Sequence, residues 1–401
     1  MNFKKQVKIL VYFIPFTREP REDTISTRIP LLYSILKDNL VELYKAPQIP
    51  NIGNFALTRF FLLITSGTLI LQLLPRIKQY FHHVIVVGSD QPSGFVASIL
   101  GRLLKIFGKL GNKDVLIVYD SHGSRYKLAQ DLSPPLPYKM VSIFEDAYSV
   151  KAADIVLIPT FADHIIYSSY ISKKSKFMIL PSFVKTDRVV YREWGQRTIN
   201  FAFHANFKYP PNVDALRIIS QWLSTVKNIH DIRIIIFGIN SFIAYKLLPS
   251  ELFERNNIKI FGYISNPFYI LGNTQFYLAP IFKGTGIITK VLEAMAAGCI
   301  PITTKFVSLG IPELKQWPEL VANSPEDWIY KLNNHLSKAY EMNYDAISKR
   351  LSDIVKHKYS YETNKQNLKR KLFLLLRNAK KVNYERMYFY LNLNLDLDGK
   401  V

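Results

Sequence analysis

Short, continuous apolar runs alternate with longer mixed segments along the first half of the chain. The apolar runs are rich in Val and Ile, and they lie at 7–14, 83–90, 114–123 and 153–160. Strands that are buried on both faces of a parallel sheet have this continuous apolar pattern. The segments between them, such as GFVASILGRLLKIFGKL, carry apolar residues at helical spacing. This alternation predicts a parallel sheet with helices on both faces.

The same rhythm begins again in the second half of the chain. The segment 183–200 has no clean period, and we expect the linker between two domains there. Further strand-like runs lie at 199–207, 232–238, 258–264, 276–282 and 299–304. We therefore predict an α/β protein with two Rossmann-like parallel-sheet domains that face a cleft, where the carboxyl ends of the strands bind ligands. The expected boundaries are 1–185, 186–355 and, for a basic helix and tail, 356–401.

The chain is strongly basic, with 52 Lys and Arg against 31 Asp and Glu and a formal net charge of +21. Nucleic acid, acidic phospholipid and phosphorylated small molecules are all anionic partners that fit this charge. The sequence has no zinc finger, aromatic RNA-binding strand signature or basic zipper, so we predict no specific nucleic acid partner. The single cysteine, Cys299, excludes an intrachain disulfide and fits a reducing, cytoplasmic compartment.

Three segments bear on contact with a membrane. The most apolar stretch, 60–74, is shorter than the ~20 residues of a spanning helix, so we expect a buried or interfacial helix. The basic segments 101–113 and 364–381 have the pattern of helices that lie on an anionic membrane surface. The alternative for both is a domain helix with a solvated basic face, which we favour for the first. The overall charge indicates peripheral contact with an anionic membrane surface.

The stretch KGTGIITKVLEAMAAGCIPITT, from Lys283 to Thr304, has the pattern of a turn followed by a helix that Gly298 ends. Glycines let the backbone approach a ligand closely, and the free amides of a helix start attract anions such as a pyrophosphate. Lys290 and Glu293 lie three residues apart on one helical face, and a glutamate there can accept hydrogen bonds from ribose hydroxyls. By spacing alone, an ordinary turn and helix with a solvent-facing Lys–Glu pair explains the pattern equally well.

Two signals for a metal ion are weak. Asp396 and Asp398 form a D-x-D pattern, but neither follows a nucleotide-binding strand. His82 and His83 have no third ligand at metal spacing. We predict no metal site and no cofactor.

Several stretches resemble the GT-B glycosyltransferases, in particular the large retaining group called family 4. GTGIITKVLEAMAAGCIPITT resembles the donor-site signature, and FKYPPNVDALRII resembles the opening of the donor domain. FEDAYSVKAADIVLIPT and MILPSFVKTDRV are similar to the end of the acceptor domain and its exit. These matches follow the family order over roughly 115 to 315, whereas the first hundred residues match only in rhythm.

The resemblance implies a metal-independent, hexosyltransferase-like enzyme that moves a sugar from a nucleotide diphosphate. The donor would bind to 186–355 and the acceptor to 1–185, with 356–401 packing back on the N-terminal domain. A nucleotide-diphosphate sugar is then the co-substrate. The expected acceptor is a glycan or a lipid-linked glycan. The basic charge of the chain is the reason to include a lipid-linked acceptor, which would lie at a membrane. The expected location is the cytoplasm, with the cytoplasmic membrane face as a site of peripheral contact.

The resemblance also implies roles for donor-site residues. Glu293 matches the glutamate that holds the ribose, and Gly286 matches the glycine that faces the diphosphate, beside Gly284. Thr285 stands where the family usually has a glutamate near the donor sugar, which is a departure. Tyr263 and Ile264 follow the strand that lies under the nucleobase, and Tyr263 either stacks on the base or belongs to the core.

Three further residues carry catalytic expectations. His122 matches a histidine on the acceptor side, close to the donor sugar, and Asp120 either orients its imidazole or caps the loop. Lys208 and Lys290 are the cations expected to neutralise the diphosphate, with a solvated lysine as the alternative for Lys208.

Two other functions of the protein remain open. One is a non-catalytic relative that binds a sugar nucleotide or a glycan, which Thr285 and the few cations favour. The other is an epimerase, which needs catalytic carboxylates and histidines across the cleft.

Overall fold

A computed structural model describes the chain in the ranges 9–14, 41–45, 55–80, 83–109, 114–170, 177–226, 232–254, 257–337 and 339–365. The described residues separate into two compact units: the chain passes from the first to the second between Pro181 and Ser182, and Lys365 belongs to the first unit again. The predicted tail beyond 365 lies outside the described residues.

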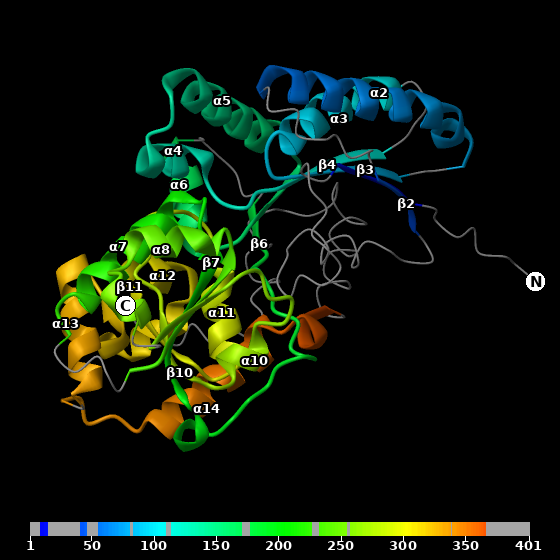
Figure 1. The fold of residues 1–401 in the computed structure, drawn as a ribbon. Coiled ribbons are helices and arrows are strands. Elements are labelled where there is room, and N and C mark those ends of the chain that lie inside the picture. Colours follow the sequence, from blue (N-terminus) through cyan, green and yellow to red (C-terminus); the bar gives the residue numbers. More distant parts are fainter. Residues whose placement is uncertain are drawn as a thin grey trace, which may run out of the picture. The chain divides into compact units, whose positions relative to one another are not determined.

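The first unit contains a six-stranded parallel sheet in the order β2-β1-β3-β4-β5-β6 (Figure 1). Its strands are β1 (Ile9–Ile14), β2 (Val41–Lys45), β3 (His83–Ser89), β4 (Asp114–Asp120), β5 (Ile155–Ile158) and β6 (Phe177–Ile179). The four apolar runs predicted as strands are β1, β3, β4 and β5, and their central side chains are buried. The α/β, parallel-sheet prediction is therefore confirmed for this unit.

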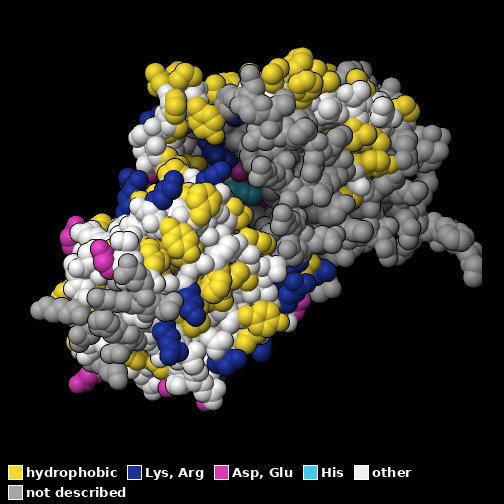
Figure 2. All heavy atoms as spheres, viewed as in Figure 1, with side chains coloured by type: hydrophobic (Ala, Val, Ile, Leu, Met, Phe, Trp, Pro, Cys, Tyr) yellow, Lys and Arg dark blue, Asp and Glu magenta, His cyan; other side chains and the backbone are white. Residues whose placement is uncertain are grey.

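The helices of the first unit are α2 (Phe55–Tyr80), α3 (Ser93–Lys109), α4 (Arg125–Leu132), α5 (Leu136–Ala152) and α6 (Phe161–Tyr170). Helix α3 packs on β3 and β4 and contacts both α2 and α5 (Figure 1). In the space-filling view, hydrophobic side chains gather on the outer surface over α2 and α5 (Figure 2). Helix α2 contains the apolar stretch 60–74 and extends beyond it at both ends.

The second unit contains a six-stranded parallel sheet in the order β12-β11-β10-β7-β8-β9. Its strands are β7 (Ile199–Asn206), β8 (Ile234–Ile239), β9 (Ile258–Phe261), β10 (Thr274–Leu278), β11 (Ile300–Thr304) and β12 (Val321–Ala322). The chain runs outward from β7 to β9 and then returns to pair β10 with the other side of β7. Such a reversal is the place where open α/β sheets bind ligands.

The helices that surround this sheet are α7 (Pro210–Leu223), α8 (Ala244–Leu247), α9 (Glu251–Glu254), α10 (Phe268–Leu271), α11 (Thr289–Ala296), α12 (Lys305–Gly310), α13 (Pro325–Leu336) and α14 (Tyr344–Ile354). The segment expected as a linker packs on this unit. The Trp194 ring lies 5.2 Å from that of Tyr344, and Arg197 donates to the carbonyl oxygens of Thr274 and Ala297.

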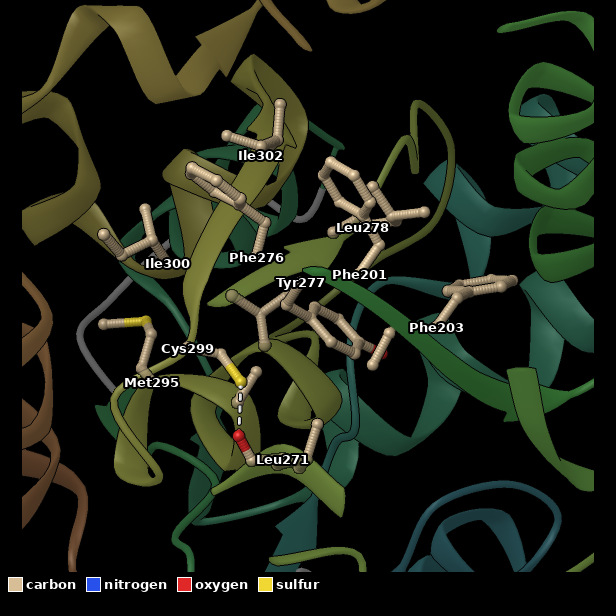
Figure 3. Close-up of a cluster of buried hydrophobic side chains, with 14 of the residues drawn as sticks. Phe201, Phe203, Leu271, Phe276, Tyr277, Leu278, Met295, Cys299, Ile300 and Ile302 are labelled. Carbon is tan, nitrogen blue, oxygen red and sulfur yellow. Dashed lines mark hydrogen bonds between the residues drawn. The ribbon is translucent and has the colours of Figure 1, made fainter. Parts of the chain in front are cut away.

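The core of the second unit forms around the central strands β7, β10 and β11 (Figure 3). The stacked rings of Phe201 and Phe276 lie 5.7 Å apart. Cys299 is fully buried, and its thiol donates a hydrogen bond of 2.9 Å to the carbonyl oxygen of Leu271 (Figure 3). Burial raises the pKa of this thiol to about 12, so the cysteine is a core residue.

Candidate functional site

A pocket of about 190 Å³ opens at the carboxyl ends of β7 and β8 in the second unit. The loop after β9 and one face of α11 complete its wall. Its lining includes His204, Asn206, Phe237, Ile239, Tyr263, Ile264, Lys290 and Glu293. The pocket therefore lies beside the reversal of strand order, and four residues predicted for the donor site or for catalysis line it.

Gly238 allows the ends of β7 and β8 to come together beneath this pocket. Its φ is +132°, and a Cβ at this position would lie 2.1 Å from the carbonyl oxygen of Ala205. An L side chain would therefore suffer both an unfavourable backbone conformation and a clash. Glycine at this position is a structural requirement of the pocket.

Glu293 is a buried carboxylate that α11 directs toward β7. Its Oε2 lies 2.8 Å from Nε2 of His204. The imidazole of His204 stacks on Phe237, with ring centroids 4.9 Å apart and an interplanar angle of 10°. His204 is thus held by packing, and it fixes the orientation of Glu293. Its Nδ1 is buried and has no hydrogen-bond partner among the described residues.

Lys290 lies one turn before Glu293 and reaches the start of α7. Its Nζ donates to Oδ1 of Asn212 at 2.6 Å, and it lies 6.0 Å from the ring centroid of Phe203. Burial lowers the pKa of Lys290 to about 8, against the attraction of the Glu293 carboxylate. The predicted Lys–Glu pair is therefore part of the pocket wall, and the solvent-facing alternative is wrong.

The glycine turn that precedes α11 lies beside this pocket and does not line it. Gly284 and Gly286 have φ values of +140° and +71°, which glycine adopts readily. Gly310 of α12 packs against the turn, since a Cβ on it would lie 2.9 Å from the Gly286 carbonyl oxygen. Thr285, between the two glycines, is partly buried.

The C-terminal end of α11 has the predicted glycine cap. Gly298 has φ +77°, its amide donates to the Met295 carbonyl oxygen, and the Cys299 amide donates to that of Ala294. This pair of hydrogen bonds is the Schellman motif. The local sequence therefore fixes where α11 ends.

The other predicted donor-site residues differ in position. Tyr263 and Ile264 line the pocket, and Tyr263 is 42% exposed, so it does not belong to the core. Lys208 is exposed in the loop after β7 and does not line the pocket. Its backbone amide donates to Oδ1 of Asn206 at 3.1 Å.

His122 lies in the first unit, directly after β4. Its Nε2 is 3.3 Å from Oδ2 of the buried Asp120 and 3.1 Å from Oγ of Ser89. Ser89 in turn donates to the same Asp120 oxygen at 2.7 Å. Asp120 therefore orients the imidazole, as one of the two interpretations expected. The His122 side chain remains 31% exposed, so a ligand can reach it.

Asp90 and Arg125 flank the other side of His122, and sequence reasoning did not identify them. Oδ2 of Asp90 lies 3.9 Å from Nδ1 of His122, and Arg125 forms an ion pair with Asp90. Burial alone would raise the pKa of Asp90, but Arg125 and His122 outweigh it and lower that pKa. The position of Asp90 at the carboxyl end of a predicted strand was the signal that could have found it.

A buried polar network holds the His122 loop from behind. Asp146 of α5 accepts hydrogen bonds from the hydroxyls of Tyr119 and Tyr167, and from the amide of Arg125 at 2.9 Å. Burial raises the pKa of Asp146 to about 6 despite these donors. Ser121 Oγ lies 2.6 Å from the Tyr167 hydroxyl. The loop that carries His122 is therefore rigidly placed on its own unit.

No group of three or more His, Cys, Asp or Glu is arranged to hold a metal ion in the part of the chain that the structure describes. The D-x-D pair, Asp396 and Asp398, lies outside that part.

Comparisons with known proteins assign this architecture. Residues 198–338, which include the whole pocket, match the family model of glycosyl transferases group 1. A search of curated proteins finds no match. Sucrose-phosphate synthase from Thermosynechococcus elongatus is similar in structure, with a TM-score of 0.64 and 11% sequence identity. The alignment covers 92% of this chain and 100% of the synthase chain.

Two other solved structures are similar over most of the chain. HepE from Anabaena, solved in complex with UDP, has a TM-score of 0.62 at 11% identity and covers 92% of this chain and 100% of its own. WaaG, a glycosyltransferase involved in lipopolysaccharide biosynthesis, has a TM-score of 0.57 at 14% identity. The alignment covers 90% of this chain and 98% of the WaaG chain. The chain thus has the GT-B fold of glycosyltransferases, and its residues 198–338 match the glycosyl transferases group 1 model.

Proposed function

We propose that this protein is a retaining glycosyltransferase that moves a sugar from a nucleotide diphosphate to a glycan or lipid-linked acceptor. The observation that carries the proposal is the pocket at the carboxyl ends of β7 and β8, where Glu293 and Lys290 lie on one face of α11. A buried carboxylate and a cation one turn apart can bind a ribose and a diphosphate in succession along the helix. The group 1 match over 198–338 supports the same donor class.

The nucleotide has a defined orientation in this proposal. The base lies against Tyr263 and Ile264, at the outer wall of the pocket. The vicinal ribose hydroxyls donate to Glu293, whose carboxylate His204 already orients. The diphosphate then extends toward Lys290 and the glycine turn that begins at Gly284. HepE was solved with UDP and with UDP-glucose, so UDP is the first nucleotide to test.

The chemical step transfers the sugar without a protein nucleophile. The bond from the anomeric carbon to the diphosphate oxygen breaks, and a bond to the acceptor oxygen forms on the same face of the sugar. The leaving diphosphate accepts the acceptor's hydroxyl proton. Lys290, with Lys208 from the loop after β7, stabilises the charge that grows on the diphosphate, and this role requires no metal ion. His122, which belongs to the first unit, is proposed to take part in the transfer step.

Donor turnover tests this proposal and separates it from a non-catalytic relative, which Thr285 in the place of the family's glutamate favours. The full chain is incubated with a panel of nucleotide-diphosphate sugars, and the release of free nucleoside diphosphate is measured. We expect the wild type to release nucleoside diphosphate from one of the donors, and Glu293→Gln to lose this activity. Glu341→Gln is the control, because Glu341 is an exposed glutamate, and it should retain the activity. Binding without release would favour the non-catalytic relative. A product with inverted anomeric configuration, read by proton NMR, would contradict retention.

We also propose a cytoplasmic location, because the chain has a single cysteine and Cys299 forms no disulfide.

A further inference from the structure

The outward face of α2 is apolar along most of its length. The described side chains that are large, apolar and exposed on this helix are Leu57 (45%), Phe60 (57%), Phe61 (43%), Ile64 (47%) and Leu71 (63%). The helix has 26 residues and contains no Asp or Glu. Soluble proteins normally keep the outer face of a surface helix polar, and a contiguous apolar patch indicates an interaction site.

The opposite face of α2 is packed in the core of the first unit. Leu62 and Leu73 are buried against the sheet, and the Tyr12 hydroxyl of β1 donates to the carbonyl oxygen of Ser66. By length and composition, Ala56–Pro75 could cross a membrane, and only 28% of that apolar window is buried inside the protein. Because the inner face is already occupied by the sheet, a helix that crossed the bilayer would have to leave its core. A partner can therefore contact the exposed face while the helix stays packed on the sheet.

Two neighbouring helices extend this apolar face. Helix α3 exposes Leu103 and Ile106, at 46% and 61%. Helix α5 exposes Leu136, Met140 and Phe144, each above 60%. Helix α3 contacts both α2 and α5, and an ion pair links α2 to α5 through Arg59 and Glu145. The hydrophobic side chains over α2 and α5 in Figure 2 belong to this surface.

The charges on these three helices are almost all positive. Their sequences contain eight Lys or Arg, three in α2, three in α3 and two in α5, against two acidic residues. Both acidic residues, Glu145 and Asp146, are buried, at 2% and 1% exposed. Arg102 and Lys151 are exposed. The surface therefore combines apolar side chains with cations and presents no carboxylate from these helices.

We infer that the outward faces of α2, α3 and α5 form a surface that inserts into an anionic phospholipid bilayer. The apolar side chains enter the boundary between headgroups and acyl chains, while exposed cations such as Arg102 and Lys151 pair with lipid phosphates. A second copy of this chain is a poorer occupant, because it would place two basic surfaces against each other. This inference does not depend on the identity of the donor or on catalysis.

Vesicle sedimentation of the full chain tests the inference. Vesicles of phosphatidylcholine are compared with vesicles that also contain phosphatidylglycerol. We expect binding to the anionic vesicles, reduced about tenfold or more by the triple substitution Phe60→Ser, Ile64→Ser and Leu71→Ser. Tyr330→Ser is the matched control, because Tyr330 is 64% exposed on α13 of the second unit. It should bind as the wild type does.

Two further readings decide the outcome. The unfolding temperature of the triple variant should equal that of the wild type, since the three side chains are exposed. If the triple variant is less stable, the vesicle comparison is repeated with Leu71→Ser alone. Absence of wild-type binding, equal binding to neutral vesicles, or unchanged binding of the folded variants would overturn the inference. So would a wild-type dimer in analytical ultracentrifugation that the triple substitution converts to a monomer without vesicles.

Discussion

Glu293 and His204 are separated by 89 positions in the chain but form one hydrogen-bonded unit in the pocket. A carboxylate that must accept two ribose hydroxyls needs a fixed orientation, and a packed imidazole provides it at one oxygen. The position of Glu293 in the pocket wall could be predicted from its place in the helix after the glycine turn. The contact of His204 with Glu293 could not be predicted, because in the sequence His204 is one more inward residue of a strand.

Removing the imidazole should weaken nucleotide binding. We predict that His204→Leu lowers nucleoside diphosphate affinity by about tenfold and the free energy of unfolding by about 1–3 kcal/mol, because a buried carboxylate loses a hydrogen-bond partner. Calorimetric titration and urea unfolding measure the two effects. The exposed His357 provides the control His357→Leu, which should change neither. Unchanged affinity in His204→Leu would show that Glu293 is oriented by other groups.

We predict that Lys290 gives nucleotide binding a pH dependence. The pKa of Lys290 is lowered to about 8 by burial, so the lysine loses its charge as the pH rises through that value. A bound diphosphate favours the charged form and raises this pKa. Affinity should therefore be constant below about pH 8 and fall by up to about tenfold per pH unit above it. Lys290→Met should remove this decline and Lys208→Met should retain it, in titrations across the same pH range.

The reactivity of Cys299 tests the packing of the second unit. Burial raises the pKa of its thiol to about 12, and the thiol donates to a backbone carbonyl oxygen. We predict no reaction of the native protein with a thiol reagent at pH 8, and one reacting thiol per chain after unfolding in guanidinium. Rapid modification of the native protein would contradict the described core.

At the scale of elements, the central strands could be predicted because burial on both faces leaves a continuous apolar run. The short edge strands β2, β6 and β12 escaped prediction, since their two to five residues form no such run, whereas the edge strand β9 was predicted from 258–264. The glycine turn before α11 was also predicted, but its place beside the pocket follows from how α12 packs on it. Long-range packing of this kind is not encoded in local spacing.

The close approach of β7 and β8 predicts that replacing Gly238 by alanine has a much larger effect on stability than replacing Gly262. Gly238→Ala should lower the free energy of unfolding by at least about 2 kcal/mol and abolish nucleotide binding, because of its positive φ and the Ala205 carbonyl oxygen. Gly262→Ala is the control, since a Cβ there would meet no atom within 4 Å. Thermal unfolding and nucleotide titration of both variants make the comparison. Equal stability of the two would contradict the described strand ends.

At the scale of the whole molecule, the candidate residues divide between the two units. Glu293 and Lys290 belong to the second unit, whereas His122 and Asp120 belong to the first. The order of the motifs along the chain predicted this division and the GT-B fold. It could not predict the apolar outer face of α2, because the helical pattern of 60–74 is apolar all round and does not reveal which face the sheet covers.

We expect this division to separate nucleotide binding from sugar transfer. We predict that His122→Ala binds nucleoside diphosphate with wild-type affinity but releases it from a sugar nucleotide at least about tenfold more slowly. His164→Ala, which changes another histidine of the first unit, is the control. Loss of nucleotide affinity in His122→Ala would contradict the assignment of the donor to the second unit alone.

The most direct test of the donor pocket is thermal unfolding of the wild type and of Glu293→Gln with UDP, GDP, ADP, CDP and TDP. We predict that one nucleotide raises the unfolding temperature of the wild type in a concentration-dependent way, and that Glu293→Gln removes this stabilisation. Stabilisation by none of the five, or equal stabilisation of the variant, would contradict a nucleotide-diphosphate site at Glu293.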